Sequence, residues 1–318
     1  MTRKLGTIRL DLINACNERC TFCPYFGEGG SVVQHKKRLV PLTKLDIPLL
    51  LENLRDLKSS SIEPKIQISG EGEATLHPDF FNLVSGLSAL GLKFRIITNG
   101  QILDRFKDVL ISSGAEIVVS IHGRGSVHDE IVQKKGAYDL VRKNVSLFDP
   151  PSVTVAVVIC DSNVADLELI FAEWKAHAIR FSHNFLAHST SPRFDVSSLW
   201  QRLQKLKEKS NVRIIPDMNA DEMAAYYSTG FHVINPTHCD YFDGSITIRS
   251  DGKVINCQDT VLGDLRCESL AALVGGEKFA SANFAIASNF ESGQTHSSCD
   301  RCCYQVPPSK LVQIRSSK

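Results

Sequence analysis

Three cysteines lie within eight residues near the start of the chain, in the segment Cys16-Asn17-Glu18-Arg19-Cys20-Thr21-Phe22-Cys23. Their spacing is C-x3-C-x2-C, and they directly follow a strand-like run, Ile8–Leu12. Three thiolates on one short loop suit three corners of an iron–sulfur cubane and leave one iron open for another ligand. Because structural zinc normally takes four protein ligands, a zinc site completed from elsewhere remains an alternative, as do three buried thiols.

The composition indicates the cellular location and the partners that a protein with such a metal centre would have. The chain has ten cysteines and neither a signal-peptide pattern nor a membrane-spanning apolar stretch, so we expect a cytoplasmic protein whose clustered thiols bind metal. Lys plus Arg number 36 and Asp plus Glu 35. This near-neutral balance predicts no nucleic-acid partner and no membrane-surface partner.

Short β-branched runs alternate with longer amphipathic segments through the first two thirds of the chain. The predicted strands are Ile8–Leu12, Lys65–Ile68, Lys93–Ile97, Glu116–Ile121, Val153–Ile159, Ile179–Phe185 and Val212–Ile215. The predicted helices are Leu42–Ser59 with Thr43 as its N-cap, Asp79–Leu90, Gln101–Ser112, Tyr138–Leu147, Val164–His177 and Val196–Lys209. This alternation predicts an α/β fold, a partial (β/α)6 barrel of the TIM type with its chemistry at the carboxyl ends of the strands.

The alternation stops near residue 235, which divides the chain into a predicted barrel (1–235) and a Cys-rich domain (236–318). A hairpin is predicted over 245–255, with its turn at Ser250-Asp251-Gly252. Cysteines lie on both sides of this hairpin and near the end of the chain: Cys239, Cys257, Cys299, Cys302 and Cys303. The pattern C-x12-G-x4-C followed by C-x2-C suits a closed four-thiolate iron–sulfur cluster or a zinc ribbon.

Motifs at successive strand ends, together with the first cysteine loop, resemble the radical S-adenosylmethionine (SAM) superfamily. The segment Ile68–Pro78 resembles its Gly-x-Gly-Glu-Pro loop, with Ala74 in place of Pro. The resemblance implies that Cys16, Cys20 and Cys23 hold a 4Fe–4S cluster that binds SAM. It also implies contacts of SAM with Phe22 (adenine), with the loop residues Gly70, Gly72 and Glu73 (methionine amino group), and with Asn99, Ser120 and His122 (ribose and carboxylate).

The C-terminal pattern resembles the twitch domain, a shortened SPASM extension found in some members of this superfamily. That resemblance implies an auxiliary 4Fe–4S cluster held by Cys239, Cys257, Cys299 and Cys302, with Cys303 as the alternative to Cys302. A barrel followed by one twitch cluster is similar to the aminocyclitol and aminoglycoside dehydrogenases and epimerases of antibiotic biosynthesis.

The resemblance implies reductive cleavage of SAM to a 5′-deoxyadenosyl radical, driven by a partner such as flavodoxin or ferredoxin. The radical would abstract hydrogen from a small polar substrate, such as a sugar or aminocyclitol, and lead to an oxidised or epimerised product. Cys160 and Cys267 are the candidate hydrogen-atom donors. A peptide-modifying enzyme is the alternative, although the fifteen residues before Cys16 leave no room for a peptide-recognition domain. A non-catalytic iron–sulfur or zinc protein is the remote alternative.

Overall fold

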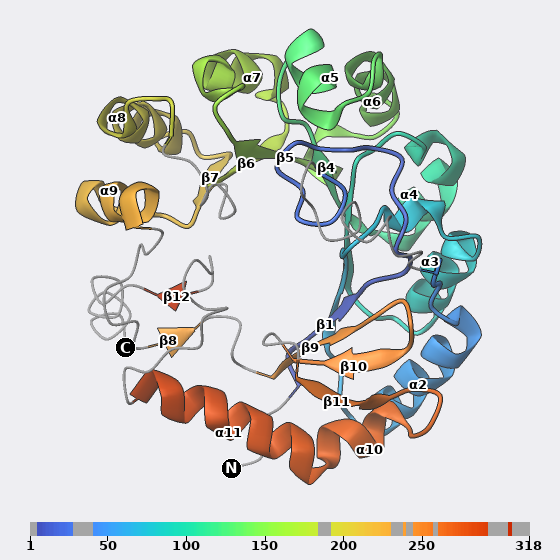
Figure 1. The fold of residues 1–318 in the computed structure, drawn as a ribbon. Coiled ribbons are helices and arrows are strands. Elements are labelled where there is room, and N and C mark those ends of the chain that lie inside the picture. The colour runs from blue at the N-terminus through green and yellow to red at the C-terminus, as the bar shows by residue number, and fades with distance from the viewer. Residues whose placement is uncertain are drawn as a thin grey trace.

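The computed structural model describes residues 5–27, 41–183, 192–229, 238–239, 244–256, 260–291 and 305–306. Within these ranges, seven parallel strands follow one another in chain order along one curved sheet (Figure 1). They are β1 (Thr7–Leu10), β2 (Lys65–Ile68), β3 (Phe94–Thr98), β4 (Glu116–Ser120), β5 (Val153–Ile159), β6 (Ala178–His183) and β7 (Val212–Ile215). The α/β class and the partial barrel are confirmed, and each of the seven predicted strands has a counterpart among β1 to β7.

Helices surround the outer face of this sheet (Figure 1). They are α2 (Ile47–Ser59), α3 (Phe80–Ala89), α4 (Lys107–Ser113), α5 (Ser126–Val132), α6 (Ala137–Val145), α7 (Leu167–Trp174), α8 (Val196–Lys207) and α9 (Ala220–Thr229). Short 3-10 turns lie at η2 (Ala74–Leu76), η3 (Leu103–Phe106), η4 (Pro150–Ser152) and η5 (Val164–Asp166). None of the helices in the described ranges is long and apolar enough to cross a membrane.

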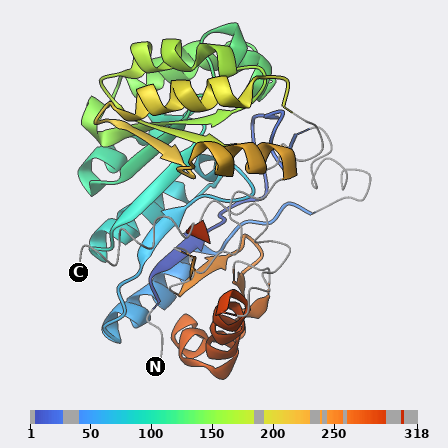
Figure 2. The same ribbon diagram turned by 90° about the vertical axis from the view of Figure 1, so that its left-hand side faces the viewer.

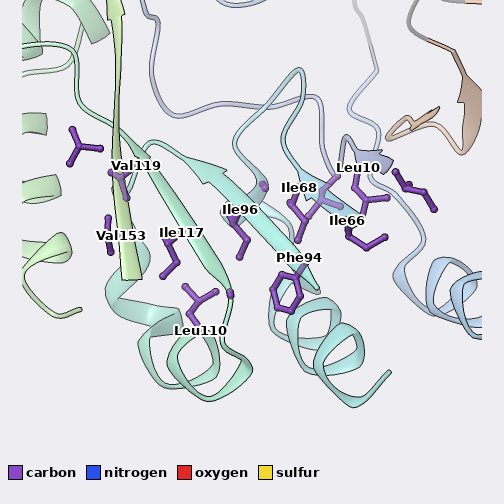
Figure 3. Close-up of a cluster of buried hydrophobic side chains, with 14 of the residues drawn as sticks. Leu10, Ile66, Ile68, Phe94, Ile96, Leu110, Ile117, Val119 and Val153 are labelled. Carbon is purple, nitrogen blue, oxygen red and sulfur yellow. The ribbon is translucent and has the colours of Figure 1, made fainter. Parts of the chain in front are cut away.

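The core fills the space between the strands and these helices. Side chains alternate along each strand, so one set packs outward on the helices, and Figure 3 shows part of this set. Leu10, Ile68 and Ile96 of that set are fully buried, and each such side chain contributes about 1.5–3 kcal/mol. The intervening residues, among them Arg9 and Gln67, therefore face the lumen of the barrel.

The start of α2 differs from the prediction. The helix begins at Ile47 rather than near Leu42, and Asp46 is its N-cap, accepting a hydrogen bond from the backbone N–H of Leu49 at 3.0 Å. A proline in the first turn fits this start, because the first helical N–H groups need no partner inside the helix. Thr43 is therefore not the cap, and its hydroxyl bonds that of Ser250 at 2.6 Å instead.

The C-terminal segment extends the barrel sheet. The predicted hairpin is confirmed as β9 (Ser245–Ile248) and β10 (Lys253–Ile255), with Gly252 at its turn at φ 83°. β9 runs parallel to β1, pairing Thr7 with Ser245 and Leu10 with Ile248. With β11 (Val261–Asp264) at its edge, the sheet order is β11-β10-β9-β1. The predicted boundary near residue 235 lies outside the described residues and stays a prediction.

Two further helices follow β11 (Val261–Asp264). They are α10 (Leu270–Gly275) and α11 (Glu277–Glu291), and Figure 2 shows them at the opposite end of the molecule from α8. The N–H of Leu270 donates to the buried side chain of Asn53 on α2 at 2.7 Å. A hydrogen bond between α2 and the start of α10 thus fastens the C-terminal segment to the outside of the barrel.

Candidate active site

The first cysteine loop begins a few residues after β1, at the carboxyl end of the strand. Cys16, Cys20 and Cys23 are each half-buried free thiols. A tight turn places the N–H of Cys23 on the carbonyl of Cys20 at 2.9 Å, and the N–H of Phe26 lies 3.3 Å from the Cys23 sulfur. Within the described ranges, no three His, Cys, Asp or Glu side chains converge closely enough to hold a single metal ion. A cubane cluster does not require three side chains to converge on one ion, since each thiolate binds its own iron.

Two neighbouring elements hold this loop in place. The N–H groups of Arg19 and Thr21 donate to the carbonyls of Val132 and Ile131 at the end of α5, at 3.0 and 2.8 Å. From the end of β3, the side-chain amide of Asn99 donates to Asn17 Oδ1 at 2.6 Å. Figure 1 shows the dark-blue loop extending from β1 across to α5. The predicted residue Asn99 thus orients the cysteine loop directly.

The loop after β2 packs on the backbone that precedes Cys16, and this contact requires glycine. A Cβ at Gly72 would lie 2.1 Å from the carbonyl oxygen of Ile13 and 2.4 Å from that of Ala15. A Cβ at Gly70 would lie 1.8 Å from Asp11 Oδ1. Neither position can hold a larger residue without moving the segment that leads into the cysteines.

Glu73 is buried and accepts four hydrogen bonds. Its Oε1 receives the N–H of Thr75 at 3.1 Å, the hydroxyl of Thr75 at 2.6 Å and the hydroxyl of Thr98 at 2.7 Å. Its Oε2 receives the N–H of Asn99 at 2.8 Å. The carboxylate therefore ties the end of β2 to the end of β3. Oε2 keeps one lone-pair position for a further donor.

His122 and Phe22 meet at the end of β4. Their rings lie edge to face, with centroids 4.8 Å apart. The N–H of Val158 donates to His122 Nδ1 at 3.2 Å, and burial lowers the pKa of His122 to about 3. The imidazole is therefore neutral with its proton on Nε2. Ser120, the last residue of β4, is half-buried on the lumen face in register with Ala156.

Two buried residues, His128 and Asn163, lie behind His122 and hold its backbone. The backbone N–H of His122 donates to His128 Nδ1 at 3.1 Å. The amide of Asn163 donates to the carbonyls of His122 and Val158, both at 2.7 Å, and its Oδ1 accepts the N–H of Cys160 at 2.9 Å. Asn163 thus joins the ends of β4 and β5 and fixes the backbone of Cys160.

The two candidate hydrogen-atom donors lie in different places. Cys160 follows β5 and is half-buried on the lumen face, since Ile159 before it is buried outward. Cys267 is exposed and follows β11, which six strands separate from β5 in sheet order, and Figure 1 shows β11 and β5 across the barrel from each other. The structure does not bring the two thiols together. Beyond Cys160, His183 Nδ1 lies 2.8 Å from the hydroxyl of Tyr227.

Burial shifts the proton affinities of the cysteine loop. It raises the pKa of the Cys16 thiol to about 12 and that of Cys20 further still. It also raises the pKa of Glu18 to about 8, with nearby Glu73 adding to the effect. Iron binding needs thiolates, so the positive charge of the metal has to offset this burial.

Of the predicted auxiliary ligands, the described residues include Cys239. It lies on β8 (His238–Cys239), which pairs antiparallel with β12 (Gln305–Val306), and its partner in register is Gln305. That pairing places Cys239 across from a residue three positions after Cys302. Cys257, Cys299, Cys302 and Cys303 lie outside the described residues.

Comparison with known families decides whether the first cysteine loop belongs to an iron–sulfur enzyme, a zinc site or a set of buried thiols. The model of the radical SAM superfamily matches residues 10–172, just over half of the chain. This chain belongs to the radical SAM superfamily. The model of the iron–sulfur cluster-binding SPASM domain matches residues 239–303. The cofactors of this radical SAM enzyme are therefore SAM with a 4Fe–4S cluster, and an auxiliary iron–sulfur cluster in the C-terminal region.

Curated relatives of the radical SAM enzyme include two cyclases. A probable GTP 3′,8-cyclase of Saccharolobus solfataricus is 33% identical over 122 residues, covering 38% of this chain and 36% of that protein. The GTP 3′,8-cyclase of Microcystis aeruginosa is 26% identical over 191 residues, covering 56% of each chain. The match thus spans only about a third to just over half the length of these relatives.

Solved structures share the fold of the radical SAM enzyme. BtrN in complex with AdoMet and 2-DOIA has a TM-score of 0.51 and 14% identity, covering 95% of this chain and 93% of that one. Streptococcus suis SuiB bound to the precursor peptide SuiA has a TM-score of 0.61 and 14% identity, covering 88% and 67%. At this identity the likeness concerns the fold alone.

The residues at the site fit both cofactors. Three half-buried thiols on one loop supply the soft donors that an iron–sulfur cluster needs. Beside them, Gly70 is exposed and Gly72 is half-buried, and the half-buried ring of Phe22, packed edge to face on His122, offers an apolar surface to an adenine.

Proposed function

We propose that this radical SAM enzyme acts on a C–H bond of a small polar molecule, such as a sugar or aminocyclitol, and oxidises or epimerises it. In this proposal Cys16, Cys20 and Cys23 hold the SAM-binding cluster. The observation that carries it is the contact between the cysteine loop and the loop after β2, which holds Gly70, Gly72 and Glu73 and is called the SAM-side loop below. Gly72 packs on the backbone before Cys16, and the N–H of Glu73 donates to the carbonyl of Ala15 at 2.8 Å. This contact supports one site made from both loops.

The bound cluster and SAM would supply a 5′-deoxyadenosyl radical that removes a hydrogen atom from the substrate. The residues of the chain orient the reactants for this step. Gly70 and Gly72 admit the methionine end of SAM, and the free lone pair of Glu73 Oε2 receives its ammonium group. Phe22 faces the adenine, and Ser120 and His122 lie at the end of β4 for the ribose or carboxylate. Asn99 keeps the cysteine loop in register with these groups.

A small substrate is favoured over a peptide by the extent of the likeness to BtrN, which covers nearly all of both chains. The BtrN structure contains 2-DOIA, and the SuiB structure contains a peptide. An auxiliary cluster ligated by Cys239, Cys257, Cys299 and Cys302 (or Cys303) would accept an electron when the substrate is oxidised. A protein such as flavodoxin or ferredoxin would reduce the first cluster.

Iron analysis with SAM cleavage tests the proposed ligands. We expect about eight irons in the reconstituted wild type, and about four in the Cys16/Cys20/Cys23→Ala variant and in the Cys239/Cys257→Ala variant. The first variant should form no 5′-deoxyadenosine with dithionite. The Cys267→Ala variant removes an exposed thiol and should keep the wild-type iron content. Formation of 5′-deoxyadenosine by the triple variant would contradict the proposal.

Deuterium labelling separates oxidation from epimerisation. If the Cys160 thiol returns a hydrogen atom to the substrate carbon, reaction in D2O places one deuterium there, because thiol protons exchange with solvent. The thiyl left behind then takes one electron and one proton from the reducing system. Oxidation would instead leave no solvent deuterium and would survive Cys160→Ala. The assay reads the product mass for wild type and for Cys160→Ala, with Cys267→Ala as the matched thiol control.

A further inference from the structure

Asp11 and Arg249 lie side by side at the carboxyl ends of β1 and β9. Leu10 pairs with Ile248, and the N–H of Asp11 donates to the carbonyl of Ile248 at 2.9 Å, so the parallel register continues to the next pair of residues. Leu10 and Ile248 are fully buried on the helix side. By strand alternation, Asp11 and Arg249 both face the lumen.

Each of these side chains has a buried polar atom without a hydrogen-bond partner among the described residues. Asp11 is 8% exposed, and its Oδ1 receives no donor. Arg249 Nε has no acceptor within hydrogen-bond distance. Its ion-pair contacts are long, since Glu71 Oε1 lies 3.9 Å from Nη2 and Asp251 Oδ1 lies 3.7 Å from Nε. Buried polar atoms of this kind normally have partners, and two complementary ones in adjacent positions indicate a ligand.

The position of the pair connects it with the proposed reaction. Asp11 touches Gly70 of the SAM-side loop, where a Cβ would lie 1.8 Å from its Oδ1. Arg249 belongs to the hairpin within the SPASM match. A molecule bound by both side chains would therefore lie beside SAM, on the side of the auxiliary domain.

We propose that Asp11 and Arg249 form a substrate-binding site for a vicinal amino alcohol or diol. The carboxylate would accept a hydrogen bond from an ammonium or hydroxyl group, and the guanidinium would donate to the neighbouring oxygen. A simple carboxylic acid is a poor ligand, because the Asp11 carboxylate would repel it. This inference rests on the proposed function and narrows its substrate class.

Calorimetric titration of the anaerobic holoenzyme with SAM tests this site. The probes are glucosamine, scyllo-inositol and 2-DOIA, with acetate as the acid. We expect at least one amino alcohol or diol to bind, and Asp11→Asn and Arg249→Met each to weaken it at least tenfold, while acetate does not bind. Arg249→Lys should lose less probe affinity than Arg249→Met, because lysine keeps the positive charge.

Arg95 and Glu116 provide matched control positions. They form a 2.6 Å ion pair across β3 and β4, near the amino ends of these strands. Glu116→Gln and Arg95→Met change the same charges as the test variants and should keep the wild-type affinity. Iron content and SAM affinity are measured on every variant, so a folding or cofactor defect is visible as such.

Three results would overturn the inference. The wild type binds no amino alcohol or diol in the panel, or Asp11→Asn and Arg249→Met bind it like the wild type, or these variants weaken SAM and leave the probe affinity unchanged. Failure of the proposed function gives a different result, because the wild type would then form no 5′-deoxyadenosine from SAM with dithionite. The two failures are therefore distinguishable.

Discussion

At Asp11, a carboxyl group is enclosed by charges from three elements: Arg9 on its own strand, Glu71 after β2, and Arg249 and Asp251 at the hairpin. Burial dominates and raises the pKa of Asp11 to about 7, whereas an unfolded aspartate has a pKa near 3.9. Below about pH 4 the side chain is protonated in both states. Between about pH 4 and 7 the unfolded chain loses this proton first, so the stability of the fold falls as pH rises.

Asp11→Asn should remove this pH dependence. The variant gains stability relative to the wild type as pH rises from about 4 to 7, by about 4 kcal/mol at most, and the difference is constant above pH 7. Urea unfolding at a series of pH values measures it. If the unfolding free energies of the wild type and of Asp11→Asn changed in parallel with pH, the raised pKa of Asp11 would be disproved.

Asn163 provides a second test at this scale. Its side chain is fully buried and makes the three hydrogen bonds that join β4, β5 and Cys160. Asn163→Ala leaves three buried backbone groups unpaired and should cost about 3–5 kcal/mol of unfolding free energy. Asn82→Ala, on an exposed part of α3, should cost less than about 1 kcal/mol. Equal losses in the two variants would show that the Asn163 network contributes little.

Residues with a motif were predictable, and residues that support them were not. The cysteine loop and Gly72 stand at spacings that identify them, and the structure shows why Gly72 has no room for a side chain. Asn163 belongs to no motif, and its role depends on two strands that meet only in the fold. Asp11 left a signal in the sequence, because Arg9 and Asp11 alternate with the apolar residues Ile8, Leu10 and Leu12.

Among the elements, the loop after β2 is the one on which most of the site depends. Glu73 accepts donors on both carboxylate oxygens, from Thr75, Thr98 and Asn99. Glu73→Gln puts an NH2 group against one of these donors in either rotamer. We expect at least a tenfold loss of 5′-deoxyadenosine formation and about 1–3 kcal/mol of stability. Glu63→Gln, at an exposed position before β2, is the control, and wild-type SAM cleavage by Glu73→Gln would contradict the assignment.

The strands and most helices were predictable because their apolar periodicity is strong. The start of α2 was not, since Leu42 and Leu45 continue its apolar pattern while Asp46 and the following proline set the helix start. The helices α5, α9, α10 and α11 were not predicted, and the seven-residue α5 was missed for a different reason. It is too short for a clear period, and its importance lies in two carbonyl groups, those of Ile131 and Val132, that receive the cysteine loop.

At the scale of the whole molecule, the hairpin and the barrel share one sheet. Ile246 on β9 pairs with Ile8 on β1, and both are buried. Ile246→Ala should lower the unfolding free energy of the whole protein by about 2–5 kcal/mol. Val261→Ala, on the exposed face of β11, should cost less than about 0.5 kcal/mol. Circular dichroism and the absorbance of the first cluster should report one coincident transition, and separate transitions would show that the hairpin folds independently of the barrel.

The pairing of β9 with β1 also sets how far apart the two redox centres can be. The first predicted ligand set follows β1, and Cys257 follows β10 of the hairpin. The strands can slide past each other only in steps of two residues, about 6.6 Å, because a one-residue slip would turn Ile246 and Ile248 into the lumen. If the clusters are held as proposed, the offset between the strands that carry these ligands changes only in such steps. Substitution of single side chains would then leave this offset in place, whereas an insertion or deletion of residues would change it.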